Sequence, residues 1–155
     1  MEAGLRALQQ GNFNIGVLQE MKLTLGIHTR FGAGYTVGVM HTDIRHMRGV
    51  SLVGIYRAGW QVEVIFNYGL KVVSFVLTTG RPRWYIVRSY VPPNDAPSLA
   101  RMEQALGRAV KGVEVILLGD LSVRLGETRD AQEEELAPVV ANCGLEDMMD
   151  HYMPR

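Results

Sequence analysis

The chain has 155 residues and a mass of 17.3 kDa, which fits one domain and is too small for two. Apolar residues make up 47% and charged residues 21%, a balance that excludes a disordered tail, a collagen-like fibre and a coiled coil. The single cysteine, Cys143, and an N-terminal segment unlike a signal peptide argue against a secreted disulfide scaffold. No apolar stretch approaches the length of a membrane span. We therefore expect a nuclear or cytoplasmic protein with no membrane partner.

The formal net charge of zero conceals an uneven distribution along the chain. Residues 1–112 hold 13 basic and 6 acidic side chains, a net charge of +7, whereas residues 113–155 hold 3 and 10, a net charge of −7. One interpretation is a polarised domain whose basic side can meet a polyanion. The other is that the acidic part is a solvated helix face, since residues 133–135 are three consecutive glutamates.

The first forty residues predict one helix and two strands. The spacing of leucine and alanine favours a short N-terminal helix that ends near Gly11. The apolar run 15–18 is typical of a buried strand. The segment 26–34 contains three glycines and no periodicity, so a loop is expected there. Residues 35–40 then favour a second strand.

Residues 50–90 have the composition of β-strands throughout. Four runs rich in β-branched and aromatic residues are separated by short turn-forming clusters: 50–56, 61–66, 72–77 and 84–90. Short connections favour antiparallel neighbours, because a parallel pair needs a crossover of a dozen or more residues. We expect an antiparallel meander over this part of the chain.

The hydrophobic period changes after the paired prolines 92 and 93. Apolar residues between 99 and 110 fall at helical spacing, with Asp95 or Ser98 as the N-cap and Gly112 as the stop. The nearly continuous apolar run 113–118 favours a strand covered on both faces.

A last helix is predicted after a polar loop. Asp130 and Glu133 are spaced like an N-cap and the residue that reaches back to it, and Gly144 marks the end. Pro138 lies inside and is expected to kink or restart the helix. Four residues would form its buried face: Leu136, Val139, Val140 and Cys143. The order of elements indicates a mixed α/β layered domain.

Two carboxylates follow buried strands at equivalent places. Glu20 comes just after the run 15–18, and Asp120 comes just after the run 113–118. Side chains at strand ends emerge at the rim of a sheet, where ligands commonly bind. Two such acids from distant positions could share one Mg²⁺ ion, which binds a few carboxylate oxygens and keeps several waters. The competing interpretation is that both acids are ordinary solvated residues at strand ends.

Tyr90 also ends a predicted strand, because the prolines that follow cannot extend a sheet ladder. A phenol held at this rim could donate a hydrogen bond to a phosphate oxygen, or it could be a half-buried core residue. The four histidines lack zinc-ligand spacing, and the glycine-rich stretches match no nucleotide-binding loop. No serine lies in a G-x-S-x-G frame.

Four ordered segments resemble motifs of the endonuclease/exonuclease/phosphatase superfamily. They are similar to its LQE-x-K, GGVAL, Y-x-P and GDFN motifs and lie at 18–22, 48–52, 90–93 and 118–122. Further segments resemble the endonuclease-type domains of non-LTR retrotransposon reverse transcriptase proteins, including craniofacial-development-protein-2-like sequences: 72–75, 83–87, 144–148 and 151–155. The resemblance covers nearly the whole chain.

The resemblance implies a single domain over residues 1–155, of the α/β (α+β) class, with a DNase I-like two-sheet β-sandwich flanked by helices. It implies hydrolysis of phosphodiester bonds with Mg²⁺ or Mn²⁺. Glu20 would be a metal ligand, Asp120 would lie near the metal and orient or deprotonate the attacking water, and Tyr90 would contact the phosphate. Three residues are candidates for substrate contact: Lys22, Asn94 and Ser122.

The chain departs from the family pattern in three places. It begins after the family's first strand, which carries an asparagine near the metal, and it stops before the C-terminal strand with the catalytic aspartate and histidine. The domain is therefore expected to be truncated at both ends. Ser122 stands where the motif has asparagine. His151 follows a segment that lies well upstream of the catalytic pair in the family, so it is expected to be structural.

Three functions follow from these observations. The first is a partial Mg²⁺-dependent endonuclease-like domain of retroelement origin, weak or inactive by itself, with DNA as substrate and a reverse transcriptase domain downstream. The second is a non-catalytic relic or nucleic-acid-binding module on the same scaffold. A phosphatase acting on small molecules or lipids is the third, because one fold can serve several substrates. The sequence gives no indication of oligomeric state.

Overall fold

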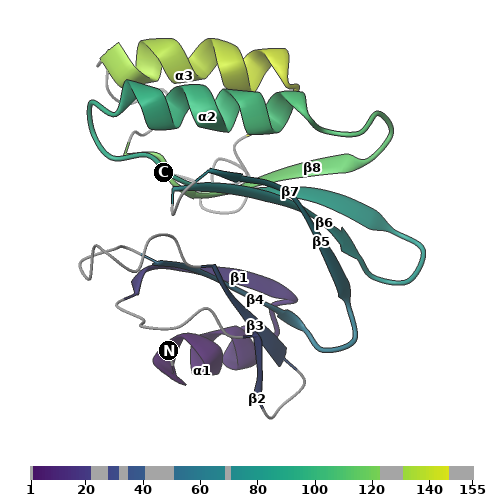
Figure 1. Ribbon diagram of the computed structural model, residues 1–155. Helices are drawn as coiled ribbons and strands as arrows, with labels where there is room; N and C mark the ends of the chain where they lie inside the picture. The colour runs from purple at the N-terminus through teal and green to yellow at the C-terminus, as the bar shows by residue number, and fades with distance from the viewer. Residues whose placement is uncertain are drawn as a thin grey trace.

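Two four-stranded β-sheets lie face to face in the computed structural model, and helices cover their outer faces (Figure 1). The structure describes residues 2–21, 28–31, 35–40, 51–68, 71–122 and 131–146. The strand order is β1-β4-β3-β2 in the first sheet and β5-β6-β7-β8 in the second. The expected sandwich of two sheets flanked by helices is confirmed.

The first sheet contains β1 (Ile15–Met21), β2 (His28–Phe31), β3 (Tyr35–Met40) and β4 (Ser51–Arg57). All its pairs are antiparallel, with β4 between β1 and β3. The expectation of a loop over 26–34 is wrong, because β2 lies inside this segment and pairs with β3. A strand of four residues between glycines is too short to show the alternation that marks longer strands.

The second sheet contains β5 (Gln61–Tyr68), β6 (Val72–Thr78), β7 (Arg83–Tyr90) and β8 (Glu114–Asp120). The strands β5, β6 and β7 form an antiparallel meander. β8 is parallel to β7, and the chain returns between them through helix α2 (Ala96–Gly107). The helical crossover is the usual way to join two parallel strands.

The prediction of one meander over residues 50–90 is wrong in its first step. β4 belongs to the first sheet and β5 to the second, so the turn at 57–59 carries the chain from one sheet to the other. Gly59 has a φ of 89°, a backbone conformation that favours glycine. A short turn can join two stacked sheets as well as two paired strands, and strand periodicity does not distinguish these cases.

Helix α1 (Glu2–Gln10) covers the first sheet, and α2 and α3 (Ala131–Asn142) cover the second (Figure 1). α3 continues through Pro138 as one helix, so the expected restart is not observed. Leu136 and Val139 are buried as predicted and Val140 is half-buried, but Cys143 is exposed, because it lies past the helix end. The predicted cap, Asp130, and the Glu133 side chain lie outside the described residues.

Among the residues that the structure describes, two hydrophobic clusters lie between these layers. One joins the second sheet to α2 and α3 and includes Val72, Tyr85 and Met102. The other lies between the two sheets and includes Phe75 and Ile86. Alternate residues of β8 pack against both clusters, which confirms that this strand is covered on both faces. Within the described ranges, no helix has both the length and the apolar character that a membrane span requires.

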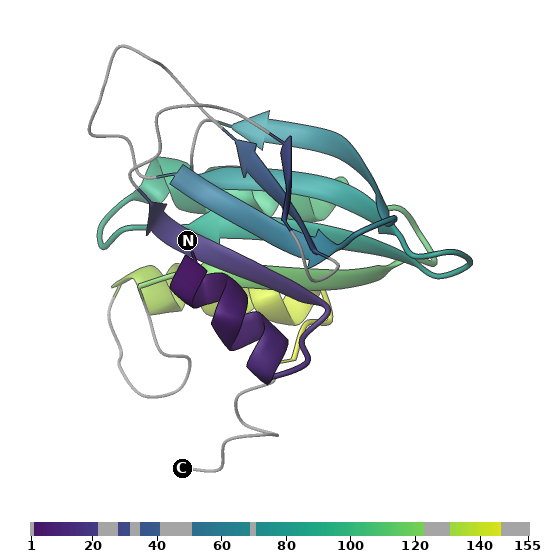
Figure 2. The same cartoon turned by 90° about the horizontal axis from the view of Figure 1, so that it is seen from below.

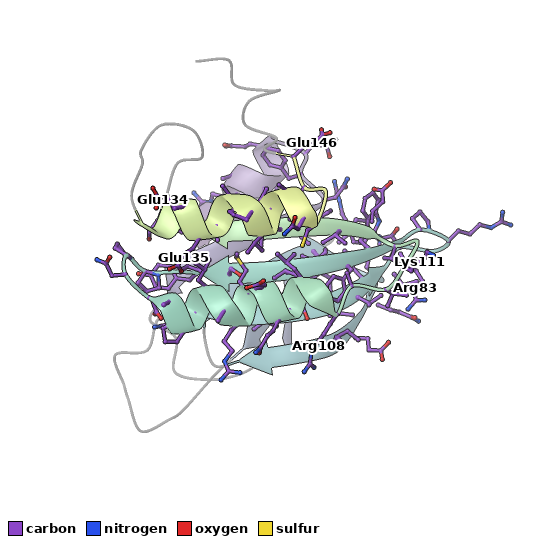
Figure 3. The ribbon with its side chains drawn as sticks, turned by 90° about the horizontal axis from the view of Figure 1, so that it is seen from above. Arg83, Arg108, Lys111, Glu134, Glu135 and Glu146 are labelled. Atoms are coloured by element: carbon purple, nitrogen blue, oxygen red, sulfur yellow. The ribbon has the colours of Figure 1, made fainter. Side chains whose placement is uncertain are left out.

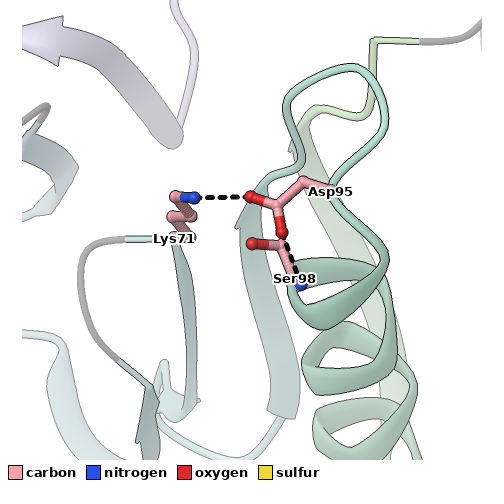
Figure 4. A network of polar contacts seen from close by, with 3 residues as sticks. All are labelled: Lys71, Asp95 and Ser98. Atoms are coloured by element: carbon pink, nitrogen blue, oxygen red, sulfur yellow. Dashed lines mark hydrogen bonds and ion pairs between the residues drawn. The ribbon is translucent and has the colours of Figure 1, made fainter.

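The start of α2 is fixed by polar contacts of Asp95 (Figure 4). One carboxylate oxygen accepts a hydrogen bond from the Ser98 backbone N–H at 3.0 Å, and the other accepts one from Lys71 Nζ at 2.5 Å. Burial raises the pKa of Asp95, but the hydrogen bonds from Lys71 and Ser98 outweigh it and leave the pKa below its usual value. Asp95 therefore caps the helix and ties it to the residue that precedes β6.

Two substitutions at Asp95 distinguish the contribution of the helix cap to stability from that of the ion pair. Asp95→Ala removes both and should lower the free energy of unfolding by about 1–2 kcal/mol. Asp95→Asn keeps a good cap and loses only the ion pair, which is worth about 0–1 kcal/mol because Lys71 is 46% exposed. Urea unfolding at pH 7 measures both values, and a larger loss in the asparagine variant would contradict this assignment.

The lowered pKa gives the ion pair a pH dependence of known sign. A carboxylate whose pKa is depressed in the folded state stabilises the protein fully above its unfolded pKa of about 4, and the contribution is lost as pH falls through the folded pKa. The stability difference between wild type and Asp95→Asn should therefore shrink below about pH 4. A difference that grows on acidification would refute the prediction.

Candidate functional site

Three strands that carry predicted site residues run toward the same end of the sandwich (Figures 1 and 2). β1 contains Glu20 next to its last residue, and β7 and β8 end at Tyr90 and Asp120. The pairing of β1 with β4 shifts register between Leu18 and Met21, so an irregularity coincides with the position of Glu20. The Glu20 side chain and all of Lys22 lie outside the described residues.

Tyr90 and Asp120 are neighbours across the parallel β7–β8 pair. Their Cα atoms are partners in the register of the two strands. The backbone immediately after Tyr90 continues the ladder, because the Val91 N–H donates to the Asp120 carbonyl at 2.8 Å. On the other side, the Tyr90 N–H donates to the Lys71 carbonyl at 2.7 Å. The predicted phosphate-contacting and water-orienting residues therefore share one rim.

The Asp120 carboxylate is exposed and partly oriented by the backbone. Its Oδ1 atom accepts a hydrogen bond from the Ser122 N–H at 2.8 Å, which closes a turn directly after β8. Ser122 has a φ of 53°, a left-handed backbone conformation that is uncommon for a residue with a side chain. The Oδ2 atom makes no hydrogen bond within the described part of the chain, so one carboxylate oxygen is available for a ligand.

The other two predicted contact residues occupy turns beside this rim. Asn94 is exposed, has a φ of 58° and lies between β7 and the N-cap of α2. Ser122 is half-buried, and its backbone N–H is already used by Asp120. The structure thus brings Tyr90 and Asp120 together, with Ser122 directly after the strand end and Asn94 in the turn after β7.

The donor chemistry of this rim fits a hard divalent cation. Carboxylate oxygens are the ligands that Mg²⁺ and Mn²⁺ prefer, and Asp120 presents one that is not otherwise bonded. Among the residues that the structure describes, no three histidine, cysteine, aspartate or glutamate side chains gather into a site. The sequence indicates Glu20, whose side chain lies outside the described residues, as a second protein ligand.

Gly119 allows β8 to approach β7 closely just before Asp120. Its φ is 143°, and a Cβ atom built on it would lie 1.7 Å from the Ser89 backbone oxygen. No side chain fits there unless the two strands separate. The close packing of β7 against β8 therefore explains why a glycine precedes Asp120, without reference to any ligand.

Sequence analysis missed Arg88, a buried cation between the two sheets. Its side chain is 3% exposed and its guanidinium lies 5.3 Å from the centre of the Phe75 ring. Within the part of the chain that the structure describes, the Nε and Nη1 atoms have no hydrogen-bond partner. Arg88 alternates along β7 with Trp84 and Ile86, which pack in the cluster between the two sheets, so strand alternation could have placed it on the inner face.

Arg88 and Tyr56 influence each other across the gap between the sheets. Burial lowers the pKa of Arg88 to about 10, and the nearby Tyr56 opposes this shift. Burial raises the pKa of Tyr56, and the Arg88 charge opposes that shift in turn. Arg88 remains protonated near neutral pH, so the core holds a positive charge two residues from the rim.

Gly119→Ala should destabilise the protein by more than the roughly 1–2 kcal/mol that a left-handed backbone costs a residue with a side chain. The excess arises because the new Cβ would collide with the backbone of β7. Gly112→Ala is a matched control, since Gly112 has a φ of 83° and open space around its Cβ position. Equal losses in urea unfolding for the two variants would show that the close approach does not matter.

Arg88→Met should raise the free energy of unfolding, because it removes an unpaired buried charge and keeps an unbranched side chain in the core. Arg88→Lys retains a charge without the flat guanidinium that stacks on Phe75, and should lower it. Thermal and urea unfolding measure the stability of the two variants relative to wild type. A less stable methionine variant would mean that stacking outweighs the desolvation of the charge.

Comparison with known proteins gives matches among solved structures alone. No family model matches the chain, and no curated protein does. The endonuclease domain of TRAS1, a telomere-specific non-LTR retrotransposon, aligns over 92% of this chain with a TM-score of 0.65 and 15% identity. Humanized TDP2 of D. rerio, carrying 14 mutations, aligns over 99% with a TM-score of 0.61 and 18% identity. D. rerio TDP2 complexed with a single-strand DNA product aligns over 99% of this chain with a TM-score of 0.61 and 16% identity.

These likenesses establish the architecture. The chain spans less than two thirds of each matched structure, namely 66%, 65% and 63% of their lengths. Sequence identity below one fifth supports a shared fold and no more specific shared property. The order of elements, the two stacked sheets and the matched structures agree with the fold expected from the sequence: the chain has a DNase I-like fold.

Proposed function

We propose that this chain is a metal-dependent phosphodiesterase domain of the endonuclease type, of retroelement origin, which acts on DNA and is weak or inactive by itself. The observation that carries the proposal is the pairing of Tyr90 with Asp120 at the ends of two parallel strands. A phenol and a carboxylate at one rim can contact a phosphate and a water from the same side.

Two of the matched structures support DNA as the substrate class. One is the endonuclease domain of a retrotransposon, and another is complexed with a single-strand DNA product. A domain with this role would work inside the cell, in the nucleus or the cytoplasm. A reverse transcriptase domain in the same protein would be its natural companion, as in the family that the sequence resembles.

The proposed chemistry assigns one task to each residue. Glu20 and Asp120 would hold Mg²⁺ or Mn²⁺, and the ion, when bound, would offset negative charge on the phosphate during hydrolysis. The Asp120 carboxylate would orient the attacking water and accept its proton, and the Tyr90 hydroxyl would donate to a phosphate oxygen. The remaining candidates would contact the substrate: Lys22, Asn94 and Ser122.

A non-catalytic nucleic-acid-binding module is the second candidate. The second residue after the GD pair favours it, because Ser122 lacks the amide that asparagine would present, and its backbone N–H is occupied by Asp120. Such a module would bind nucleic acid in the presence of a chelator. Its affinity would fall steeply with salt, as contacts to phosphates require.

A plasmid-nicking assay with Mg²⁺ or Mn²⁺ tests the proposal. Asp120→Asn removes the proton acceptor and a metal ligand while keeping the side-chain size, and it should reduce any nicking by at least about 10²-fold. Glu20→Gln should have an effect of similar size, and Tyr90→Phe a smaller one. Glu103→Gln, which changes an exposed carboxylate on α2, is the charge-matched control and should nick like wild type.

Nicking that survives both carboxylate substitutions would show that these residues do not carry the reaction. Absence of nicking in wild type at any metal concentration, together with salt-sensitive binding in chelator, would favour the non-catalytic module. Absence of both nicking and binding would overturn both candidates.

A further inference from the structure

A second charged surface lies at the start of β7, away from the strand ends that form the candidate site. The turn between β6 and β7 meets the segment between α2 and β8 there, because Trp84 and Glu114 are partners in the parallel register. The two segments enclose an open cleft of about 390 Å³. Its lining includes Arg81, Pro82, Arg83, Trp84, Gly112 and Glu114, and we call it the Arg81 cleft.

The cations at this cleft are exposed and not neutralised. Arg81 and Arg83 in the lining, and Lys111 next to the lining residue Gly112, are all exposed. None of the three forms an ion pair with another residue in the described part of the chain. Figure 3 shows Arg83 and Lys111 at the same end of the molecule. Glu114 is the one acidic residue in the lining, so the local balance is positive.

The Arg81 cleft is separate from the rim that holds Tyr90 and Asp120. β7 runs from Arg83 to Tyr90, which corresponds to about 23 Å of extended strand. Figure 3 also shows Glu134 and Glu135 at the end of the molecule opposite to Arg83 and Lys111. Cations at this distance, beyond the Debye length of about 8 Å at physiological salt, do not act on the rim.

We propose that the Arg81 cleft binds the phosphodiester backbone of a single-stranded nucleic acid. Guanidinium groups match phosphate geometry with paired hydrogen bonds, and Arg81 and Arg83 supply two of them on either side of one proline. The half-buried Trp84 forms one wall, and a positively charged groove beside an aromatic ring is the usual arrangement for single strands. This second contact goes beyond the proposed hydrolysis and does not require it.

Fluorescence anisotropy of a labelled 12-nucleotide DNA, in chelator and over 50–200 mM salt, tests the cleft. The double variant Arg81→Glu with Arg83→Glu should bind at least tenfold more weakly than wild type at 50 mM salt. The slope of log affinity against log salt should also become shallower by about 1.4, since each lost contact to a single strand contributes about 0.7. Arg81→Lys with Arg83→Lys keeps both charges and should retain most of the affinity.

The control is a double variant with the same change in net charge at other places. Arg6→Glu on α1 and Arg101→Glu on α2 lie outside the cleft lining and should leave affinity within about twofold. Equal weakening in the two double variants would mean that binding follows net charge, and would overturn the proposal. Stronger binding to a duplex of the same length would also contradict it.

Tryptophan fluorescence locates the bound strand independently. The chain has two tryptophans, so Trp60→Phe leaves Trp84 as the single reporter in the cleft. Titration with unlabelled 12-nucleotide DNA should change Trp84 fluorescence with the same midpoint as the anisotropy. Unchanged fluorescence at saturation, or an acidic peptide that displaces the DNA at equal concentration, would refute the assignment.

Binding at the Arg81 cleft and hydrolysis at the rim can be tested independently of each other. Asp120→Asn should retain the anisotropy signal in chelator even where nicking is lost. A protein whose nicking survives Asp120→Asn and Glu20→Gln, and that shows the cleft-dependent affinity, would refute the proposed hydrolytic site alone. A protein that nicks and shows no dependence on Arg81 and Arg83 would refute the cleft alone.

Discussion

The close parallel pairing of β7 with β8 is the constraint on which the candidate site depends. It places the last residues of two strands, Tyr90 and Asp120, side by side, although thirty positions separate them in the sequence. The pairing requires a helical crossover, which α2 supplies, and a residue without a side chain at Gly119, where the β7 backbone leaves no room for one. Fold and site therefore share one requirement, and a substitution at this glycine acts on both.

Much of this arrangement could be predicted from the sequence, for physical reasons that differ between elements. β3 and β6 have clear alternation or continuous apolar runs, and their limits agree with the prediction to within a residue. The N-cap at Asp95 follows from local chemistry that needs no tertiary context. The positions of Tyr90 and Asp120 at strand ends could be predicted from the sequence, whereas their pairing across β7 and β8 is supplied by the structure.

The features that sequence could not supply depend on contacts between distant residues. β2 owes its existence to pairing with β3, and the assignment of β4 and β5 to different sheets is decided by stacking. The unbroken helix through Pro138 reflects packing of Leu136 and Val139 against the second sheet. Arg88 is buried because the first sheet stacks on its face of β7, and this stacking is not visible in the sequence of the strand.

The sheet topology also has a consequence for the order in which the domain assembles. β5, β6 and β7 are joined by short connections, whereas β1 finds its partner only when Ile15 meets Tyr56, far along the chain. Because closing a long loop costs entropy before any contact compensates it, the second sheet is expected to form early and β1 to join late. The strand that carries Glu20 would then be among the first to open in native-state hydrogen exchange, which leaves one half of the rim more dynamic than the other.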